Sequence, residues 1–281
     1  MVRDAIVVGC GIIGSTVAKA LVDRGLDVLV LDDRRSEAGT PPSGGHLKPS
    51  WFGGMPKEQY MPAMELLDKT WGLLEEKFVV RPTPITTTVY RVDTDLVMAY
   101  PFTRGTVLRL TNLTGSAPGV VYGVPGGEAT ERASMLVIAT GTWAGELAEC
   151  PKVTAKRGVS FRYATTLDRP FVKPWAPYKQ VVAHQQSPGE VWVGDGSALL
   201  ERSWTEQRTE DCARRCRAAL KLGPEVVPTK TLHGLRPYCD SDGPCLLKRL
   251  GPSAWLATGA GKSGTIAAGW VARRVLDAHL S

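Results

Sequence analysis

The chain has 281 residues, of which 43% are hydrophobic and 22% charged, and this composition excludes an intrinsically disordered protein. No apolar run reaches the roughly 18–20 residues of a membrane-spanning helix, and no signal-peptide cleavage pattern follows the first apolar stretch. Six cysteines without a C-x-x-C pair, and four histidines without ligand spacing, predict neither a disulfide scaffold nor a metal site. We therefore expect a cytoplasmic protein, in the host cytoplasm if it is viral.

The N-terminal residues predict a βαβ unit. A strand over Asp4–Val8 runs into the glycine turn Gly9–Gly14, and Ser15–Arg24 has apolar residues at helical spacing. A second strand, Asp27–Leu31, ends at Asp32. In such a unit the glycines allow a tight turn, close approach of a pyrophosphate and packing of the helix on the strand, while the acid binds ribose hydroxyls. The pattern therefore predicts a dinucleotide site.

The following elements are predicted from apolar periodicity and from turn residues. In chain order they are a Gly/Pro/Ser-rich loop over 36–54, a helix over Glu58–Phe78, a buried strand over Met135–Ala139, strands of a second, largely antiparallel sheet over Val159–Tyr163, Val181–His184 and Val191–Val193, a helix over Glu206–Lys221, a strand over Ala254–Ala257, a glycine loop over Gly259–Gly264 and a helix over Ile266–His279.

The net charge of +6 is unevenly distributed along the chain. Residues 1–100 carry a net charge of −2, whereas residues 101–281 carry one of +8. The stretch 151–180 holds seven basic side chains against the single acid Asp168, with aromatic residues between them. This pattern is typical either of a nucleic-acid contact or of a solvated basic face, and both interpretations stay open. The candidate nucleic-acid contacts are Lys156, Arg157, Phe161, Arg162 and Tyr163.

Five separated segments together resemble the D-amino-acid oxidase/glycine oxidase superfamily of flavoproteins, which includes the sarcosine oxidases. They are the N-terminal βαβ unit, the loop Ser43–His46, the strand and turn Val137–Trp143, the segment His233–Pro237, and the run Leu256–Gly264. Each motif is common alone, but their order along the chain is specific.

The resemblance implies an α/β fold with a glutathione-reductase-like Rossmann FAD-binding domain and a smaller, mainly antiparallel β-sheet substrate domain. Residues 1–80, 105–150 and 230–281 would form the first domain, and residues 81–104 and 151–229 the second. The implied cofactor is FAD. The residues that would contact it are Gly9, Gly11, Ile12, Ile13, Gly14, Asp32, Asp33, Arg34, Ser43, Gly44, Gly45, His46, Val107, Thr140, Gly141, Trp143, Gly259, Gly261, Lys262, Ser263, Gly264 and Thr265.

The resemblance also implies catalytic candidates. Arg236, in the family's G-x-R-P motif, would pair with a substrate carboxylate, although a structural arginine at a strand end is the alternative. Lys262 would assist oxygen activation by reduced flavin through its charge, or it is a solvent-facing lysine at a helix start. His46 is a weaker candidate for the same task.

The chain is shorter than most members of the family between its first helices and Met135, which implies a reduced lid and room for a large substrate. We expect an FAD-dependent oxidase of a glycine-like amine or amino acid. A first alternative is an enzyme that acts on a glycyl-modified base in DNA, similar to flavoenzymes of phage thymine hypermodification, with an oxidase or lyase outcome. A second alternative is a flavin-binding module without catalytic activity.

Overall fold

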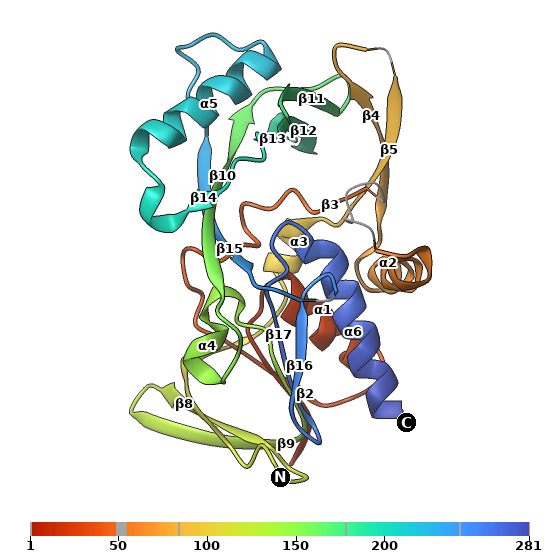
Figure 1. Ribbon diagram of the computed structural model, residues 1–281, viewed down its shortest axis with the longest axis vertical. Helices are drawn as coiled ribbons and strands as arrows, with labels where there is room; N and C mark the ends of the chain where they lie inside the picture. Colours follow the sequence, from red (N-terminus) through yellow and green to blue (C-terminus); the bar gives the residue numbers. More distant parts are fainter. Residues whose placement is uncertain (1, 49–54, 84, 178, 242, 281) are drawn as a thin grey trace.

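A computed structural model describes residues 2–48, 55–83, 85–177, 179–241 and 243–280. Figure 1 shows a lower part that holds both chain ends, and an upper part in which α5 lies across a second sheet. The helices are α1 (Ile12–Val22), α2 (Lys57–Trp71), α3 (Thr94–Met98), α4 (Ala144–Leu147), α5 (Glu206–Leu220) and α6 (Gly264–Leu280). No helix among these described residues has the length and apolar character needed to cross a membrane.

The first sheet has the order β16-β17-β9-β1-β2-β6, in which β17, β9, β1, β2 and β6 run parallel. An antiparallel extension adds β7 and β8 beside β9. The strands are β1 (Arg3–Val8), β2 (Val28–Asp32), β6 (Thr103–Arg104), β7 (Val107–Thr111), β8 (Gly119–Val124), β9 (Gly127–Ile138), β16 (Leu246–Gly251) and β17 (Ala254–Thr258). This arrangement confirms the predicted α/β class and the βαβ unit at its start.

Strand β1 is apolar along its length because both of its faces are covered. Ala5 and Val7 belong to the core that α1, α2 and α6 close on one side of the sheet, as Figure 1 shows. Ile6 and Val8 belong to a second core, to which β8 and α4 contribute on the opposite side. Side chains of a strand alternate between faces, so a sheet buried on both sides needs a continuous apolar run.

The second sheet is mainly antiparallel, as predicted, with the order β14-β10-β13-β12-β11-β4-β5-β3 and with β15 paired to β10. Helix α5 covers one face through Cys212, Ala213, Cys216 and Ala219, which recur at helical spacing and are buried. The strands are β3 (His46–Leu47), β4 (Leu74–Val80), β5 (Thr86–Arg91), β10 (Thr154–Ala164), β11 (Phe171–Ala176), β12 (Lys179–Ser187), β13 (Glu190–Gly194), β14 (Leu199–Leu200) and β15 (Lys230–Tyr238).

The predicted helix over Glu58–Phe78 is wrong in its last turns. Helix α2 ends at Trp71 because Gly72 adopts a positive φ of 71°, and Leu74–Val80 continues as strand β4, where Phe78 is buried. Strands β3, β4 and β15 belong to the second sheet, so the predicted boundaries at residues 80 and 230 differ from the sheet membership. Of the predicted 36–54 loop, His46–Leu47 forms β3, and residues 49–54 lie outside the described residues.

Candidate functional site

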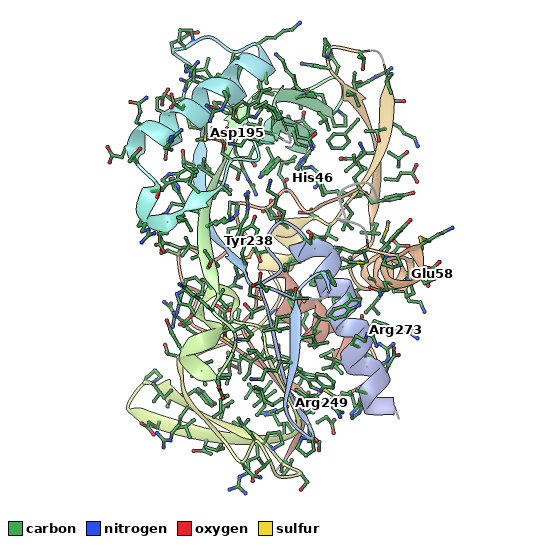
Figure 2. All side chains as sticks on the ribbon, viewed as in Figure 1. His46, Glu58, Asp195, Tyr238, Arg249 and Arg273 are labelled. Carbon is green, nitrogen blue, oxygen red and sulfur yellow. The ribbon has the colours of Figure 1, made fainter. Side chains whose placement is uncertain are left out.

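A cavity with a volume of about 720 Å³ is lined by both sheets. The first sheet contributes the carboxyl ends of its parallel strands, which is where open α/β sheets bind ligands. The second sheet contributes residues of β10, β12, β13 and β15. In Figure 2, His46 and Tyr238 lie in the middle of the molecule, between these two parts.

The glycine turn after β1 forms one end of the cavity. Gly9 has a φ of 97°, and a Cβ there would lie 2.5 Å from the carbonyl oxygen of Ala139. A Cβ on Gly14 would lie 1.8 Å from the carbonyl oxygen of Gly9, so Gly14 lets α1 pack on the turn and does not line the cavity. Gly11 and Ile13 line the cavity at the start of α1, where backbone N–H groups and the helix dipole favour an anion.

Thr40 completes this end and was not identified from the sequence. Its Oγ1 accepts a hydrogen bond of 2.9 Å from the backbone N–H of Ile12. This contact ties the loop after β2 to the start of α1, and Thr40 also lines the cavity. A lone threonine in a long loop carries no periodicity or spacing that would have predicted this contact.

Asp32 lies at the end of β2, as expected for a ribose-binding acid. Its carboxylate accepts hydrogen bonds from the backbone N–H groups of Cys10 and Arg34, and it lines the cavity beside Asp33. The predicted contact from Arg34 is wrong, because its guanidinium lies 4.0 Å from the centre of the Phe102 ring and donates to the carbonyl of Met98.

The neighbouring arginine, Arg35, lines the cavity in place of Arg34. Its Nε lies 2.7 Å from Asp33 Oδ2, and its Nη2 lies 2.8 Å from Glu146 Oε2. The guanidinium also lies 4.9 Å from the centre of the Trp143 ring. Since Arg34 and Arg35 are adjacent in the sequence, only the turn of the chain after β2 decides which one faces the cavity.

Most of the other predicted cofactor residues line the cavity. Those that do are Gly9, Gly11, Ile12, Ile13, Asp32, Asp33, Ser43, Gly44, His46, Val107, Thr140, Gly141, Trp143, Gly261, Lys262, Gly264 and Thr265. Gly45, Gly259 and Ser263 do not. A Cβ on Gly45 would lie 2.1 Å from the carbonyl oxygen of Val92, and one on Gly259 would lie 2.0 Å from Cys239 Sγ, so both glycines allow close packing of the chain.

Four buried polar atoms in the cavity wall have no hydrogen-bond partner within the described structure: Thr140 Oγ1, Thr142 Oγ1, Ser160 Oγ and Trp192 Nε1. Buried polar groups nearly always have a partner, and leaving one without costs about 1–3 kcal/mol. The wall is therefore suited to a ligand with several polar groups.

Arg236 lies on β15 at the other end of the cavity. Within the described chain no carboxylate lies at ion-pair distance from its guanidinium, and its Nη1 makes one long contact, of 3.4 Å, with the carbonyl oxygen of Ser197. On the neighbouring strand β10, Lys156 is the register partner of Arg236, and Gly158 lies diagonally across, where a Cβ would stand 3.0 Å from the guanidinium carbon. The absence of a side chain at residue 158 therefore makes room for Arg236.

Lys262 lies in the loop before α6, and it also lines the cavity. Burial lowers the pKa of this lysine, as do the nearby charges of Arg236, Lys179 and Lys156. Four cations from four separate elements of the chain therefore come together at this end. Sequence spacing alone does not show this, because the residues span positions 156 to 262.

His46 belongs to a hydrogen-bonded chain that runs out of the cavity. Its Nε2 lies 3.0 Å from His184 Nδ1, and His184 Nε2 lies 2.9 Å from Gln186 Oε1. The amide nitrogen of Gln186 donates to Asp95 Oδ2 at 2.9 Å. Trp192 stacks on the His184 ring at 5.1 Å.

The donors and acceptors along this series of hydrogen bonds follow from the Asp95 carboxylate at its outer end. A carboxylate only accepts, so the Gln186 amide nitrogen faces Asp95 and its oxygen faces His184. His184 then carries its proton on Nε2 and accepts on Nδ1 from His46 Nε2–H. His46 is left with an unprotonated Nδ1.

Burial lowers the pKa of His46 well below its usual value, and the charges of His184 and Arg91 lower it further. The pKa of His184 falls to about 3, mainly through burial. The lowered pKa favours a neutral imidazole and so does not support His46 as a positive charge beside a cofactor.

Three of the five predicted nucleic-acid contacts, Phe161, Arg162 and Tyr163, are buried and therefore wrong, whereas Lys156 and Arg157 stay predictions. Phe161 and Tyr163 are 1% and 0% exposed in the core under α5, where a base cannot stack. Arg162 is buried between Asp95 and Glu190, and Arg157 pairs with Glu37 and Glu201. Lys156 has its Nζ 4.4 Å from the centre of the Tyr238 ring. Both faces of β10 are covered here, by the core under α5 on one side and by the ion pairs of Arg162 on the other, so consecutive side chains are buried.

Among family models, the one described as FAD dependent oxidoreductase matches residues 4–96 and 102–278, which is nearly the whole chain. The chain belongs to the FAD-dependent oxidoreductase family. This result confirms the resemblance predicted from the separated motifs. Comparison of the sequence with curated proteins gives no match.

Solved structures of FAD-dependent oxidoreductases show the same fold. Glycine oxidase from Bacillus cereus is 17% identical, with a TM-score of 0.71 over 98% of this chain and 96% of that one. L-alpha-glycerophosphate oxidase from Mycoplasma pneumoniae, with FAD bound, is 14% identical, with a TM-score of 0.72 over 100% and 95%. Glycerol-3-phosphate dehydrogenase from Bacillus halodurans, complexed with FAD, is 14% identical with a TM-score of 0.70, and the chain spans 65% of its length.

The cavity fits the cofactor of this family. The glycine turn and the start of α1 suit the FAD pyrophosphate, and Asp32 suits the adenosine ribose. The unpartnered atoms of Thr140, Thr142, Ser160 and Trp192 offer hydrogen bonds to a polar ligand. The start of α6, with Gly264 and Thr265 in the wall, supplies a positive helix end for the flavin ring.

Proposed function

We propose that this FAD-dependent oxidoreductase oxidises the C–N bond of an amine that stands next to a carboxylate, as in glycine or an N-substituted glycine. The observation that carries the proposal is Arg236, whose guanidinium lines the cavity without a carboxylate partner in the described chain. A guanidinium at the wall of a cavity is suited to bind a substrate carboxylate through two parallel hydrogen bonds.

The residues of the chain have separate roles in this reaction. Arg236 binds the carboxylate and so orients the α-carbon toward the cofactor, and FAD, when bound, supplies the two-electron oxidation. The amine loses two electrons and two protons and becomes an imine, which water then hydrolyses. If the amine is attached to a larger molecule, hydrolysis or decarboxylation of the imine gives the outcome of a lyase.

Positive charge at this end of the cavity favours the reduced state of the site. The Lys262 side chain and the start of α6 line the cavity and would stabilise negative charge on FAD when it is bound and reduced. Trp192 and Val182 form an apolar wall that limits access of water. His46 lines the cavity, and its unprotonated Nδ1 is able to accept a hydrogen bond but not to donate one.

The test is anaerobic reduction of the FAD-loaded protein by glycine and by sarcosine, followed as loss of the visible flavin absorption. Arg236→Ala is expected to raise the amine concentration for half-maximal reduction by at least about 30-fold, since loss of one partner of a charge pair costs about 2–5 kcal/mol. Arg236→Lys keeps the charge but loses the paired geometry, and an intermediate value is expected.

Arg109→Ala is the matched control, because Arg109 pairs with Glu128 on the exposed antiparallel extension. Unchanged reduction kinetics in Arg236→Ala, with FAD still bound, would show that Arg236 is structural. Yellow protein that no amine bleaches would favour the alternative of a flavin-binding module without catalytic activity.

A further inference from the structure

The main cavity, which both sheets line, is acidic at one end and basic at the other. Among the described residues the acids in its wall stand at the end of the glycine turn, and they are Asp32, Asp33 and Glu146. The opposite end has Arg236 and Lys262 in its wall, and no described residue of the wall there is acidic. An excess of one charge in a cavity attracts ligands of the opposite charge, so the basic end is suited to anions.

Lys156 adds a further cation to the basic end. It is the register partner of Arg236 in an antiparallel pair, so the two side chains stand on the same face of the sheet. Burial lowers the pKa of Lys262, and the charges of Arg236, Lys179 and Lys156 lower it further. Among the described residues none of these four cations has a carboxylate at ion-pair distance. Like charges in this arrangement repel each other, and an anion that binds among them relieves the repulsion.

The side chains of Arg236 and Lys156 lean away from each other along the sheet. The Arg236 guanidinium lies beside Gly158, where a Cβ would stand 3.0 Å from the guanidinium carbon. The Lys156 ammonium lies in the opposite direction, 4.4 Å from the centre of the ring of Tyr238, whose register partner is Thr154. The basic end therefore has two separate positions for an anionic group.

The position beside Lys156 is shared with Lys262. A Cβ on Gly261 would lie 2.6 Å from Tyr238 Cε1, so the ring below the Lys156 ammonium also packs against the loop that carries Lys262. Figure 2 shows Tyr238 in the middle of the molecule. A cation above an aromatic ring keeps N–H groups that point away from the ring. Lys156 and Lys262 are therefore placed to bind one anionic group together.

A substrate with a single carboxylate uses only one of these two positions. The carboxylate of glycine or sarcosine binds Arg236, and nothing on such a substrate compensates the charges of Lys156 and Lys262. The flavin ring is uncharged while it is oxidised, so it does not compensate them when the substrate binds.

We propose that the amine oxidised in this cavity carries a second anionic group, a carboxylate or a phosphoryl group, which binds Lys156 and Lys262 while Arg236 binds the carboxylate next to the amine. This inference rests on the proposed function, and it specifies the substrate as an amino acid with a second acidic group. Carboxylate and phosphoryl groups share negative charge and acceptor oxygens, and the test distinguishes them.

The test measures, by calorimetry, the binding of unreactive analogues to the FAD-loaded protein. In each analogue an ether oxygen replaces the amine nitrogen, so no imine forms. Methoxyacetate has one carboxylate, diglycolate and its homologue with one more methylene have two, and (phosphonomethoxy)acetate has a carboxylate and a phosphonate. We expect at least one of the analogues with two acidic groups to bind about 10-fold more tightly than methoxyacetate, as one added charge-assisted hydrogen bond allows.

The variants separate the two anion positions. Lys156→Ala is expected to weaken binding of the analogues with two acidic groups about 2- to 5-fold, the range for a partly exposed charge pair, and to leave methoxyacetate unchanged. Lys156→Ala/Lys262→Ala is expected to bring their affinities to within about twofold of that of methoxyacetate. Arg236→Ala is expected to weaken binding of every analogue.

Lys152→Ala is the matched control, because Lys152 lies just before β10 and does not line the cavity. Its affinities are expected to stay within about twofold of those of the unmodified protein. The visible FAD spectrum checks that each variant is folded. Tightest binding of the phosphonate would identify a phosphoryl group as the second acid, and tightest binding of a dicarboxylate would identify a carboxylate.

Equal affinity for methoxyacetate and for all analogues with two acidic groups would overturn the proposal, as would a preference for them that the double variant keeps. These outcomes are distinct from failure of the proposed function. If sarcosine bleaches the flavin and a second acidic group brings no advantage, the second anion position is wrong and the amine oxidation stands. If the analogues with two acidic groups bind tightly and no amine reduces the flavin, the reverse holds.

Discussion

The two ends of the main cavity present different chemical groups, mainly backbone groups at one end and side chains at the other. At one end, around the glycine turn, the chain offers backbone N–H groups, a helix start and the carboxylate of Asp32. At the other end, side chains from four elements converge, with Arg236 and Lys262 in the wall. The first end depends on the path of the backbone, and the second depends on which side chains tertiary packing brings together.

The largest effect is expected where a buried side chain holds the second sheet together. Arg162→Ala leaves Glu190 and Asp95 without their partner, and we expect the free energy of unfolding to fall by about 3 kcal/mol. Chemical denaturation measures this, with Arg109→Ala as an exposed control that changes stability by less than about 1 kcal/mol. An equally small effect of Arg162→Ala would show that the second sheet does not depend on this ion-pair cluster.

The second-largest effect is a loss of FAD affinity at the end of the cavity that holds the glycine turn. Asp32→Ala removes the carboxylate that faces the ribose position, and a charge-assisted hydrogen bond is worth about 1.5–3 kcal/mol, or roughly 10- to 150-fold in FAD affinity. Equilibrium dialysis or the flavin content after purification measures the loss. Asp23→Ala is the control, because the Asp23 carboxylate pairs with Lys19 on α1 and does not line the cavity. If Asp32→Ala retained FAD fully, the Asp32 carboxylate would not be needed for FAD binding and this prediction would be wrong.

The pH dependence of the free energy of unfolding tests the pair of His46 and His184 behind the cavity. The pKa of His184 is about 3 in the folded protein and near 6.5 when unfolded, so below pH 6.5 the unfolded state binds more protons. Stability is therefore lost as the pH falls, by about 2 kcal/mol between pH 6.5 and 5 for this one group. His184→Gln should flatten that slope in denaturation curves, whereas His279→Gln, on the last turn of α6, should not.

The smallest effect is expected for a single cation at the rim of the cavity. Lys156→Ala removes one charge near Lys262 and one contact with the Tyr238 ring. We expect less than about 1 kcal/mol in stability, and a small rise in the pKa of Lys262, because a like charge is lost. Titration of the isotope-labelled lysine by NMR measures this shift. No change would place Lys156 outside the charged end of the cavity.

The difference between the two ends also explains what the sequence revealed. The βαβ unit, Asp32 and the ordered motifs follow from local spacing, and these features predicted the fold and most of the cofactor wall. Arg35 replaced Arg34 because the turn after β2 selects between neighbours. Phe161, Arg162 and Tyr163 were misassigned because a mixed stretch of cations and aromatics looks the same in a solvated strand and in one covered by α5. The Thr40 contact and the convergence of Arg236 with Lys262 require the tertiary fold.

The division of the main cavity between two sheets has an evolutionary consequence. Gln180 and Gly196 line the cavity from the side of the second sheet, so exchanges at these positions alter the room that is left for a substrate. Neither of these residues belongs to the glycine turn or to the strand end that carries Asp32. Selection on substrate size is thereby separated from selection on the redox chemistry, and the same oxidising machinery is open to new substrates through changes at a few wall positions.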